Sequence, residues 1–187
     1  MQNSRLRTLS ESAVMIALAT GLSLIKIIDF PWGGSVTLVS MLPICFLAIR
    51  HGLGWGFGSA FVYAVLQMFL SLGEVMSWGL TAVVLVATLL LDYVLPYTLL
   101  GFSGLFRQRG RIGIVAGVGL AMLLRLVCHV ISGWVLFGSW AWEGWHPLTY
   151  SIVYNGAYML PEAAFTVIVL VLLASLPQSK RLIFPAR

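Results

Sequence analysis

The chain alternates between long apolar runs and short polar connections. Six apolar runs can be marked, at about residues 9–28, 36–49, 53–72, 78–105, 112–137 and 149–176. A helix that crosses a bilayer needs about 20 apolar residues, and the second run is shorter than this. The pattern predicts an all-α integral membrane protein with six transmembrane helices, the fourth of them kinked at Pro96.

Composition supports lipid as the main solvent of the chain. Hydrophobic residues make up 60% of the 187 residues and charged residues 9%, whereas a soluble domain carries about 25% charged residues. The connections are short and no internal repeat is evident. Residues 1–187 are therefore expected to form a single six-helix transmembrane domain.

The charged residues predict the orientation of the chain in the membrane. With a cytoplasmic N-terminus, nine of the eleven Lys and Arg residues fall on the cytoplasmic side: Arg5, Arg7, Arg50, Arg107, Arg109, Arg111, Lys180, Arg181 and Arg187. The opposite loops carry Asp29, Glu74 and Glu143. Because cytoplasmic loops hold an excess of basic residues, both termini are predicted to be cytoplasmic. The net charge of +5 reflects this topology and does not indicate a nucleic-acid partner.

Aromatic and polar residues gather in the stretch GSWAWEGWHPLTYSIVYNG at residues 138–156. Tryptophan and tyrosine collect at membrane surfaces whatever a protein does, so this stretch has a simple interpretation as an aromatic belt. A second interpretation is the wall of a binding site. Tyr150, Tyr154, Tyr158 and Glu162 are spaced by four and form one stripe that runs about three helical turns inward, further than a belt extends.

Charged residues also lie within the apolar runs, where a carboxylate costs about 2.5–3.5 kcal/mol on insertion scales. In the middle of the later runs they are Asp92, Arg125 and Glu162, with His129 one turn after Arg125. One interpretation is an internal ion pair that holds the bundle together, formed by Arg125 with either Asp92 or Glu162. The other is a site for a small aromatic ligand with a positive charge, which carboxylates and aromatic rings attract.

Sequence motifs for catalysis are missing from the chain. It has no His-Glu-x-x-His zinc pair, no Gly-x-Ser-x-Gly elbow and no Walker lysine motif. Cys45 and Cys128 lack metal-ligand spacing, and the two intramembrane acids lie in no Gly-containing protease motif. We therefore expect a protein that is not an enzyme and that needs no cofactor or metal.

Several motifs in a fixed order resemble one known family, the thiamin-specific substrate-binding subunits (S-components) of energy-coupling factor (ECF) vitamin transporters. They are GGSVTLVSMLPI at 33–44, LLDY at 90–93, GLFRQRG at 104–110, HVISG at 129–133 and YSIVYNGAYMLPE at 150–162. This resemblance implies a multi-pass protein of the bacterial cell membrane that captures thiamin at the outer face. It would deliver the vitamin through a transmembrane coupling protein and two ATPase subunits.

The resemblance also implies the site residues. The family's pocket residues fall on Asp92, Tyr93, His129, Tyr150, Asn155 and Tyr63. A stacking tryptophan of the relatives aligns with Phe137, so we expect either this ring or one of the nearby tryptophans, Trp134 or Trp140, to stack on the ligand. A first-loop aromatic aligns with Gly34, with Trp32 as a nearby substitute. The small-residue motif that meets the coupling protein matches Ala13 and Ala17, since close helix contacts in lipid need small side chains.

Two alternatives to a thiamin-binding subunit remain at this point. In the first, the chain is a subunit of the same architecture for another vitamin or for a thiamin precursor such as the aminopyrimidine alone. In the second, it is a stand-alone proton-coupled carrier that uses Asp92, Glu162 and His129 as a proton relay.

Overall fold

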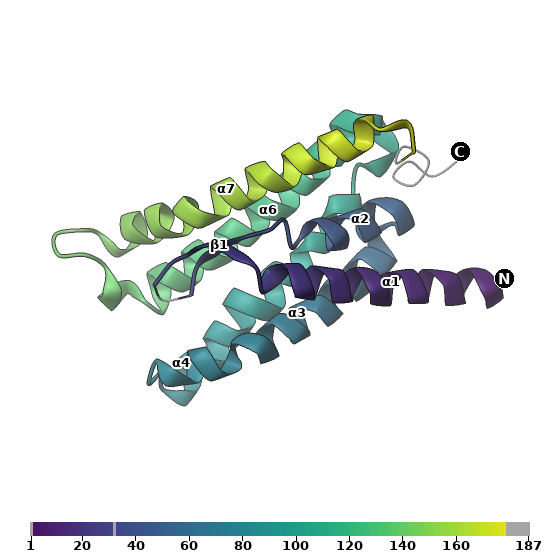
Figure 1. Cartoon of the computed structure of the whole chain (residues 1–187). Coiled ribbons are helices and arrows are strands. Elements are labelled where there is room, and N and C mark those ends of the chain that lie inside the picture. The colour runs from purple at the N-terminus through teal and green to yellow at the C-terminus, as the bar shows by residue number, and fades with distance from the viewer. Residues whose placement is uncertain (1, 32, 179–187) are drawn as a thin grey trace.

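The computed structural model describes residues 2–31 and 33–178, which form a bundle of helices with a small β-hairpin at one end (Figure 1). The helical segments are α1 Gln2–Ser23, α2 Leu42–His51, α3 Leu53–Ser77, a continuous segment Ala82–Gly104, α6 Gly110–Val135 and α7 Pro147–Ser175. Each segment overlaps one of the predicted runs, and the bounds of the first two differ from the prediction. Short 3-10 turns at Arg107–Arg109 and Gly138–Trp140 connect them.

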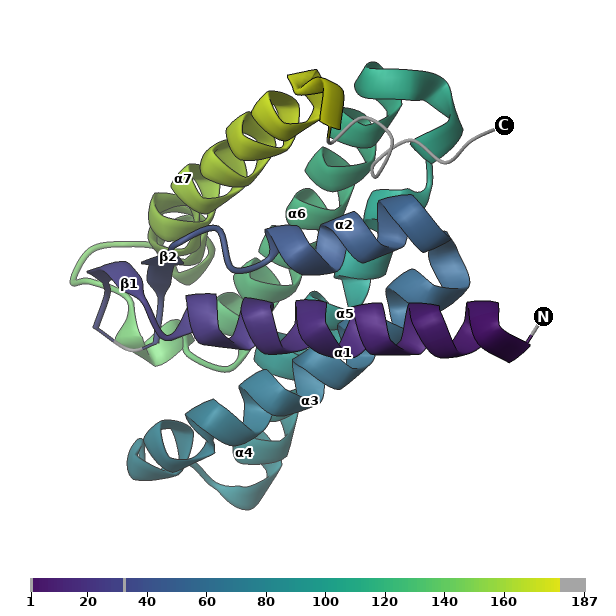
Figure 2. The same cartoon turned by 45° about the vertical axis from the view of Figure 1, so that its right-hand side comes forward.

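The membrane-protein class is confirmed within the described part of the chain. Four helices there are long and apolar enough to cross a membrane: Leu53–Ser77, Ala82–Gly104, Arg107–Val135 and Pro147–Ser175. The other two helices are of a different kind, because α1 begins with a polar stretch and α2 has only 10 residues. Figure 2 shows α1 along one side of the bundle, where it packs on α2 and α3.

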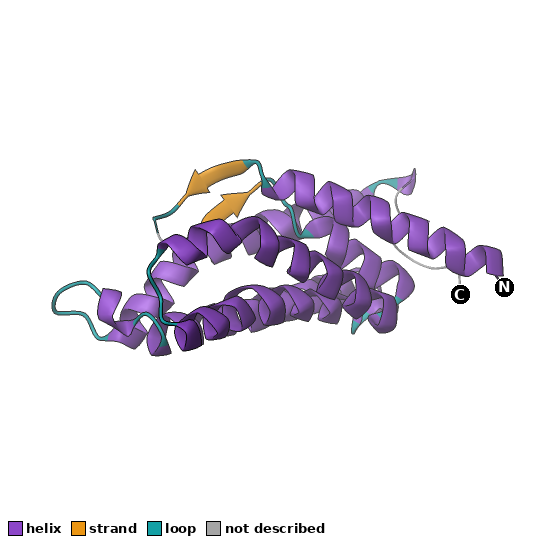
Figure 3. Ribbon diagram, turned by 90° about the horizontal axis from the view of Figure 1, so that it is seen from below, coloured by secondary structure: helices purple, strands orange, loops and turns teal. Residues whose placement is uncertain are grey.

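The first connection differs from the prediction. Helix α1 ends at Ser23, and the residues expected to continue it form strand β1, Lys26–Asp29, which pairs with the antiparallel strand β2, Ser35–Thr37 (Figure 3). The predicted boundaries of the first two apolar runs were therefore wrong. Isoleucine-rich sequence favours a strand. In the turn between the strands Gly33 has a φ of 94°, a backbone conformation that residues with a side chain rarely adopt.

Both ends of the described chain lie on the same side of the bundle, opposite the hairpin and the α6–α7 loop (Figure 1). This arrangement agrees with the predicted placement of both termini on one side. At that end Arg50 Nε lies 2.8 Å from Glu11 Oε1, and Arg107 Nη1 donates to the Arg50 carbonyl at 3.1 Å. The predicted cytoplasmic residues Lys180, Arg181 and Arg187 lie outside the described residues.

The segment Ala82–Gly104 is irregular in its middle, and Pro96 explains this. It is made of α4 Ala82–Thr88, a π-helix at Leu89–Val94, α5 Leu95–Thr98 and a 3-10 helix at Leu99–Gly104. Proline has no N–H, and its ring clashes with the carbonyl four residues earlier, which here belongs to Asp92. The helix therefore departs from regular α geometry around the acid, and such π-turns are frequent at functional sites.

Candidate ligand-binding site

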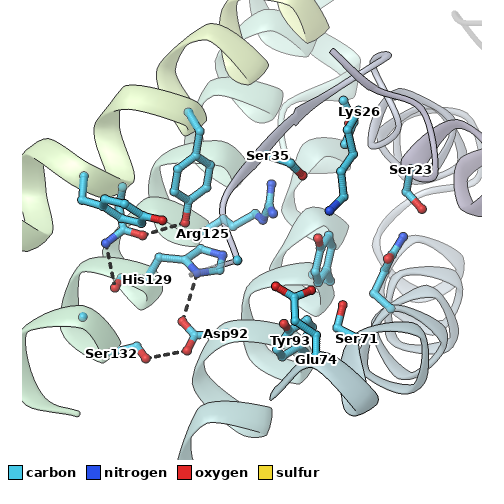
Figure 4. Close-up of a pocket in the computed structure, with 18 of the residues that line it drawn as sticks. Ser23, Lys26, Ser35, Ser71, Glu74, Asp92, Tyr93, Arg125, His129 and Ser132 are labelled. Carbon is cyan, nitrogen blue, oxygen red and sulfur yellow. Dashed lines mark hydrogen bonds and ion pairs between the residues drawn. The ribbon is translucent and has the colours of Figure 1, made fainter. Parts of the chain in front are cut away.

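A cavity of about 230 Å³ lies at the hairpin end of the bundle (Figure 4). Its wall includes Gln67, Ser71 and Glu74 from α3, Asp92 and Tyr93 from the π-helix, Arg125, His129 and Ser132 from α6, Tyr150, Tyr154 and Asn155 from α7, and Lys26, Ser35 and Thr37 from the hairpin. Aromatic faces with a few well-placed polar groups are the usual lining of a small-molecule site.

The partly buried acid of the cavity, Asp92, is held by α6. His129 Nδ1 lies 3.0 Å from Asp92 Oδ1, and Ser132 Oγ donates to Asp92 Oδ2 at 2.6 Å (Figure 4). His129 and Ser132 are three residues apart and therefore share one helix face. A carboxylate offers about four acceptor positions, so Asp92 keeps acceptor capacity for a ligand.

Asn155 connects α6 to the tyrosine stripe of α7. Its side-chain amide donates to the Ser151 carbonyl at 2.9 Å and to the His129 carbonyl at 3.3 Å, while Tyr158 donates its hydroxyl hydrogen to Asn155 Oδ1 at 2.6 Å. The two helices approach closely at Gly133, where a Cβ atom would come within 2.4 Å of Ser151 Oγ. These hydrogen bonds fix the orientation of Asn155 at the cavity wall.

The stripe predicted on α7 is present in the structure. The rings of Tyr150 and Tyr154 stack with centroids 5.7 Å apart, and those of Tyr154 and Tyr158 meet edge to face at 6.0 Å. All three rings line the cavity. The fourth member, Glu162, lies deeper and is 1% exposed. The stripe is thus a cavity wall that continues into the core, and not a surface belt alone.

A second aromatic wall is built from three rings near the mouth. Phe137 and Trp140 have ring centroids 4.8 Å apart, and Trp78 packs edge to face against them at 5.9 and 6.0 Å. Trp78 ends the α3 helix. Aromatic faces of this kind stabilise a nearby cation by about 0.5–2 kcal/mol each.

Arg125 does not form the structural ion pair that the sequence left open. Within the described residues its salt bridge to Asp92 or Glu162 is absent. Its guanidinium instead lies 4.4 Å from the centroid of the Tyr97 ring, and Nη1 lies 2.7 Å from Met41 Sδ. The partner of Asp92 is His129, whose Nδ1 lies 3.0 Å from Asp92 Oδ1.

Comparisons with known proteins agree on one family. A family model described as "Thiamine transporter protein" matches residues 9–182. The chain belongs to this family. The thiamine transporter ThiT of Bacillus subtilis (strain 168) is 32% identical in an alignment of length 186 that covers 92% of each chain. ThiT of Lacticaseibacillus paracasei is 28% identical in an alignment of length 194 that covers 95% of this chain and 92% of that one.

A solved structure of a family member has the same fold. ThiT from Listeria monocytogenes superposes with a TM-score of 0.79 at 25% sequence identity, covering 97% of this chain and 100% of that one. The predicted membership among thiamin-specific S-components is confirmed, as is the prediction of a multi-pass transport protein of the plasma membrane. The family is a transporter family and not an enzyme family.

Most residues that the resemblance assigned to the site lie in the cavity wall. They are Asp92, Tyr93, His129, Tyr150, Asn155, Phe137 and Trp140. Two others lie behind the wall. Tyr63 is fully buried and packs against the ring of Tyr97 at 5.4 Å, and Gly34 packs against Tyr158, whose ring a Cβ atom would approach to 2.6 Å. Trp32 lies outside the described residues.

A polar stripe on α3 was missed in the sequence. Gln67, Ser71, Glu74 and Trp78 all line the cavity, and their spacing of four, three and four residues places them on one helix face. The same periodicity identified the tyrosine stripe of α7, so the signal was available. Ser132 was likewise detectable, three residues after His129.

The two small residues that the resemblance assigned to partner contact lie on α1 and not in the cavity wall. Ala13 and Ala17 are exposed on α1 and lie one turn apart on its outer side. Gly21, one further turn along, is also exposed, with no atom within 4 Å of a Cβ position. Small side chains therefore line an open face of α1.

Proposed function

We propose that this chain captures thiamin at the outer face of the membrane in the cavity between α3, α6, α7 and the hairpin. Thiamin joins an aminopyrimidine ring to a positively charged thiazolium ring, which carries a hydroxyethyl group. The ligand thus requires aromatic faces, a negative counter-charge and hydrogen-bonding groups within one small cavity.

The observation that carries the proposal is the fixed carboxylate of Asp92 beside two aromatic walls. His129 and Ser132 hold this carboxylate at 3.0 and 2.6 Å, so a ligand does not have to organise it. A desolvated acid attracts a cation more strongly than an acid in water does. The rings of Trp78, Phe137 and Trp140 add aromatic faces at the mouth.

Delivery to the cell interior is proposed to need partners. The chain has no Walker lysine motif, so the energy would come from two ATPase subunits through a transmembrane coupling protein. The open face of α1 at Ala13 and Ala17 supports this part of the proposal, because small side chains let two helices approach closely in lipid.

A titration of the purified chain with thiamin tests the binding step. Because Trp78 and Trp140 line the cavity, thiamin should change the tryptophan fluorescence saturably without ATP or any partner. Trp78→Phe and Trp140→Phe should reduce this signal. Trp145→Phe is the matched control, since Trp145 is 41% exposed and lies outside the cavity wall.

The same titration separates the alternatives. A response to another vitamin, or to the aminopyrimidine as strongly as to thiamin, would favour the first alternative over a thiamin site. Vesicles that contain the chain alone test the second alternative. Thiamin uptake driven by a pH gradient in such vesicles would favour the stand-alone carrier.

A further inference from the structure

Glu162 is a buried acid that the proposed thiamin contacts do not use. It is 1% exposed, and its carboxylate accepts two hydrogen bonds from one residue of the hairpin. The Thr37 backbone N–H donates to Oε2 at 2.6 Å, and the Thr37 hydroxyl donates to Oε1 at 2.7 Å. Helix α7 is therefore bonded to the end of strand β2, 125 positions away in sequence.

The segment that Glu162 holds is a tight turn at residues 37–41. The Thr37 and Ser40 hydroxyl oxygens lie 2.7 Å apart, and the Val39 N–H donates to the Thr37 carbonyl at 2.9 Å. Val39 has a φ of 55° and is the non-glycine residue with positive φ among the described residues. A β-branched residue rarely adopts this conformation, because its Cβ approaches the backbone carbonyl.

This turn forms part of the cavity wall. Thr37, Ser40 and Met41 line the cavity, and Met41 also contacts the guanidinium of Arg125 through Sδ at 2.7 Å. Strained backbone persists only where the surrounding structure determines it, and it is concentrated at binding and active sites. At this turn the surrounding structure is the carboxylate of Glu162.

We propose that Glu162 is a positioning residue that clamps the strained 37–41 turn and so holds Ser40 and Met41 in the wall of the binding cavity. The clamp acts through hydrogen-bond acceptance and not through charge. Without it, Val39 would relax to a negative φ, and the two wall residues would move with the backbone. The inference rests on the proposed binding of thiamin in this cavity.

Three substitutions distinguish a hydrogen-bond clamp from other roles. Glu162→Met keeps the length of the side chain but removes both acceptors. Glu162→Gln keeps the clamp, because its amide oxygen accepts from the Thr37 N–H and its NH₂ group donates to the Thr37 hydroxyl oxygen. Val39→Gly lets the turn keep its positive φ without strain.

The measurement is the dissociation constant of thiamin for each purified variant, with the thermal midpoint recorded alongside. Glu162→Met should raise the dissociation constant about tenfold or more, because a change of this size corresponds to the free energy stored in such a strained backbone position. The dissociation constant of Glu162→Gln should stay within about threefold of that of the original chain. Adding Val39→Gly to Glu162→Met should restore most of the lost affinity.

Thr166→Val is the matched control on α7. Thr166 is buried one turn after Glu162, and its hydroxyl donates to the Glu162 carbonyl at 2.8 Å and not to the carboxylate that holds the turn. This variant should change the thermal midpoint without changing the affinity. If Glu162→Met does not fold, Thr37→Val removes one of the two clamp bonds, and its weaker binding should again be restored by Val39→Gly.

The outcomes are separable from those of the proposed function. If the original chain does not bind thiamin, the proposed function itself is rejected. If the original chain binds, equal losses for Glu162→Gln and Glu162→Met overturn the clamp in favour of a charge role. Unchanged affinity in Glu162→Met, or no restoration by Val39→Gly, also overturns it.

Discussion

Replacing Asp92 by Asn tests whether the acid serves the ligand or the fold. The change keeps the shape of the side chain and removes its charge. The asparagine oxygen still accepts from Ser132 Oγ, which lies 2.6 Å from the carboxylate, and the NH₂ group faces His129 Nδ1 at 3.0 Å, where a neutral imidazole accepts. Both contacts of the cluster are therefore retained.

The magnitude follows from these retained contacts. A hydrogen bond to a charged group in a desolvated site contributes about 1.5–3 kcal/mol, so thiamin should bind about ten- to a hundredfold more weakly. The thermal stability of the protein without ligand should hold or rise, since a carboxylate within a membrane-spanning segment is itself costly. Had Asp92 paired with Arg125, the same change would strand a cation and cost about 3–5 kcal/mol of stability.

The assay combines a thiamin titration with a thermal melt for Asp92→Asn and for Ser132→Ala. Ser132→Ala keeps the carboxylate and removes one neutral donor, so its effect on affinity should be smaller, about 0.5–1.5 kcal/mol. Titration with the uncharged aminopyrimidine separates a counter-charge to the thiazolium from an acceptor for the pyrimidine. A destabilised Asn variant with near-normal thiamin affinity would refute the ligand role of Asp92.

Three further outcomes are expected. Replacing Ala13 and Ala17 by Trp should leave thiamin binding intact but stop uptake in cells that express the whole transporter, because the rings hold a docking helix away; unchanged uptake would remove the docking role. Tyr158→Phe removes the donor to Asn155 Oδ1 at 2.6 Å and should cost about 0.5–1.5 kcal/mol of unfolding free energy; a melt with no shift would contradict this. Gly34→Ala places a Cβ atom 2.6 Å from the Tyr158 ring and should destabilise the protein by about 1–3 kcal/mol; an unchanged melting temperature would show that the hairpin yields without cost.

The features predicted correctly from sequence depend on local periodicity. A spacing of four places Tyr150, Tyr154 and Tyr158 on one helix face in any α-helix, so the stripe needed no knowledge of the fold. The long apolar runs likewise locate helices, because the bilayer sets their length. The irregular helix geometry around Pro96 follows from the chemistry of proline alone.

The features that the sequence did not reveal depend on contacts between distant segments. Residues 24–28 continue the apolar run of α1, so periodicity cannot separate a strand from a helix there. The partner of Asp92 was left open among the alternatives for a similar reason. Arg125 and His129 are one turn apart on α6, so their spacing alone cannot decide which of them the acid meets; in the structure it is His129.

The placement of Arg125 bears on how this cavity suits a cation. A guanidinium in the wall would repel the thiazolium if it faced the ligand unscreened. Here the guanidinium carbon of Arg125 lies 4.4 Å from the centroid of the Tyr97 ring, and Nη1 donates to Met41 Sδ at 2.7 Å.

Besides His129, four charged side chains line the cavity: Lys26, Glu74, Asp92 and Arg125. The Lys26 ammonium is paired with Asp29 Oδ1 at 3.0 Å, so Glu74 and Asp92 leave two negative formal charges against the one positive charge of Arg125. A ligand with a single positive charge neutralises this excess, whereas an uncharged ligand of the same shape lacks the attraction. The electrostatics of the cavity wall thus provide selectivity for a monocation in addition to affinity for aromatic rings.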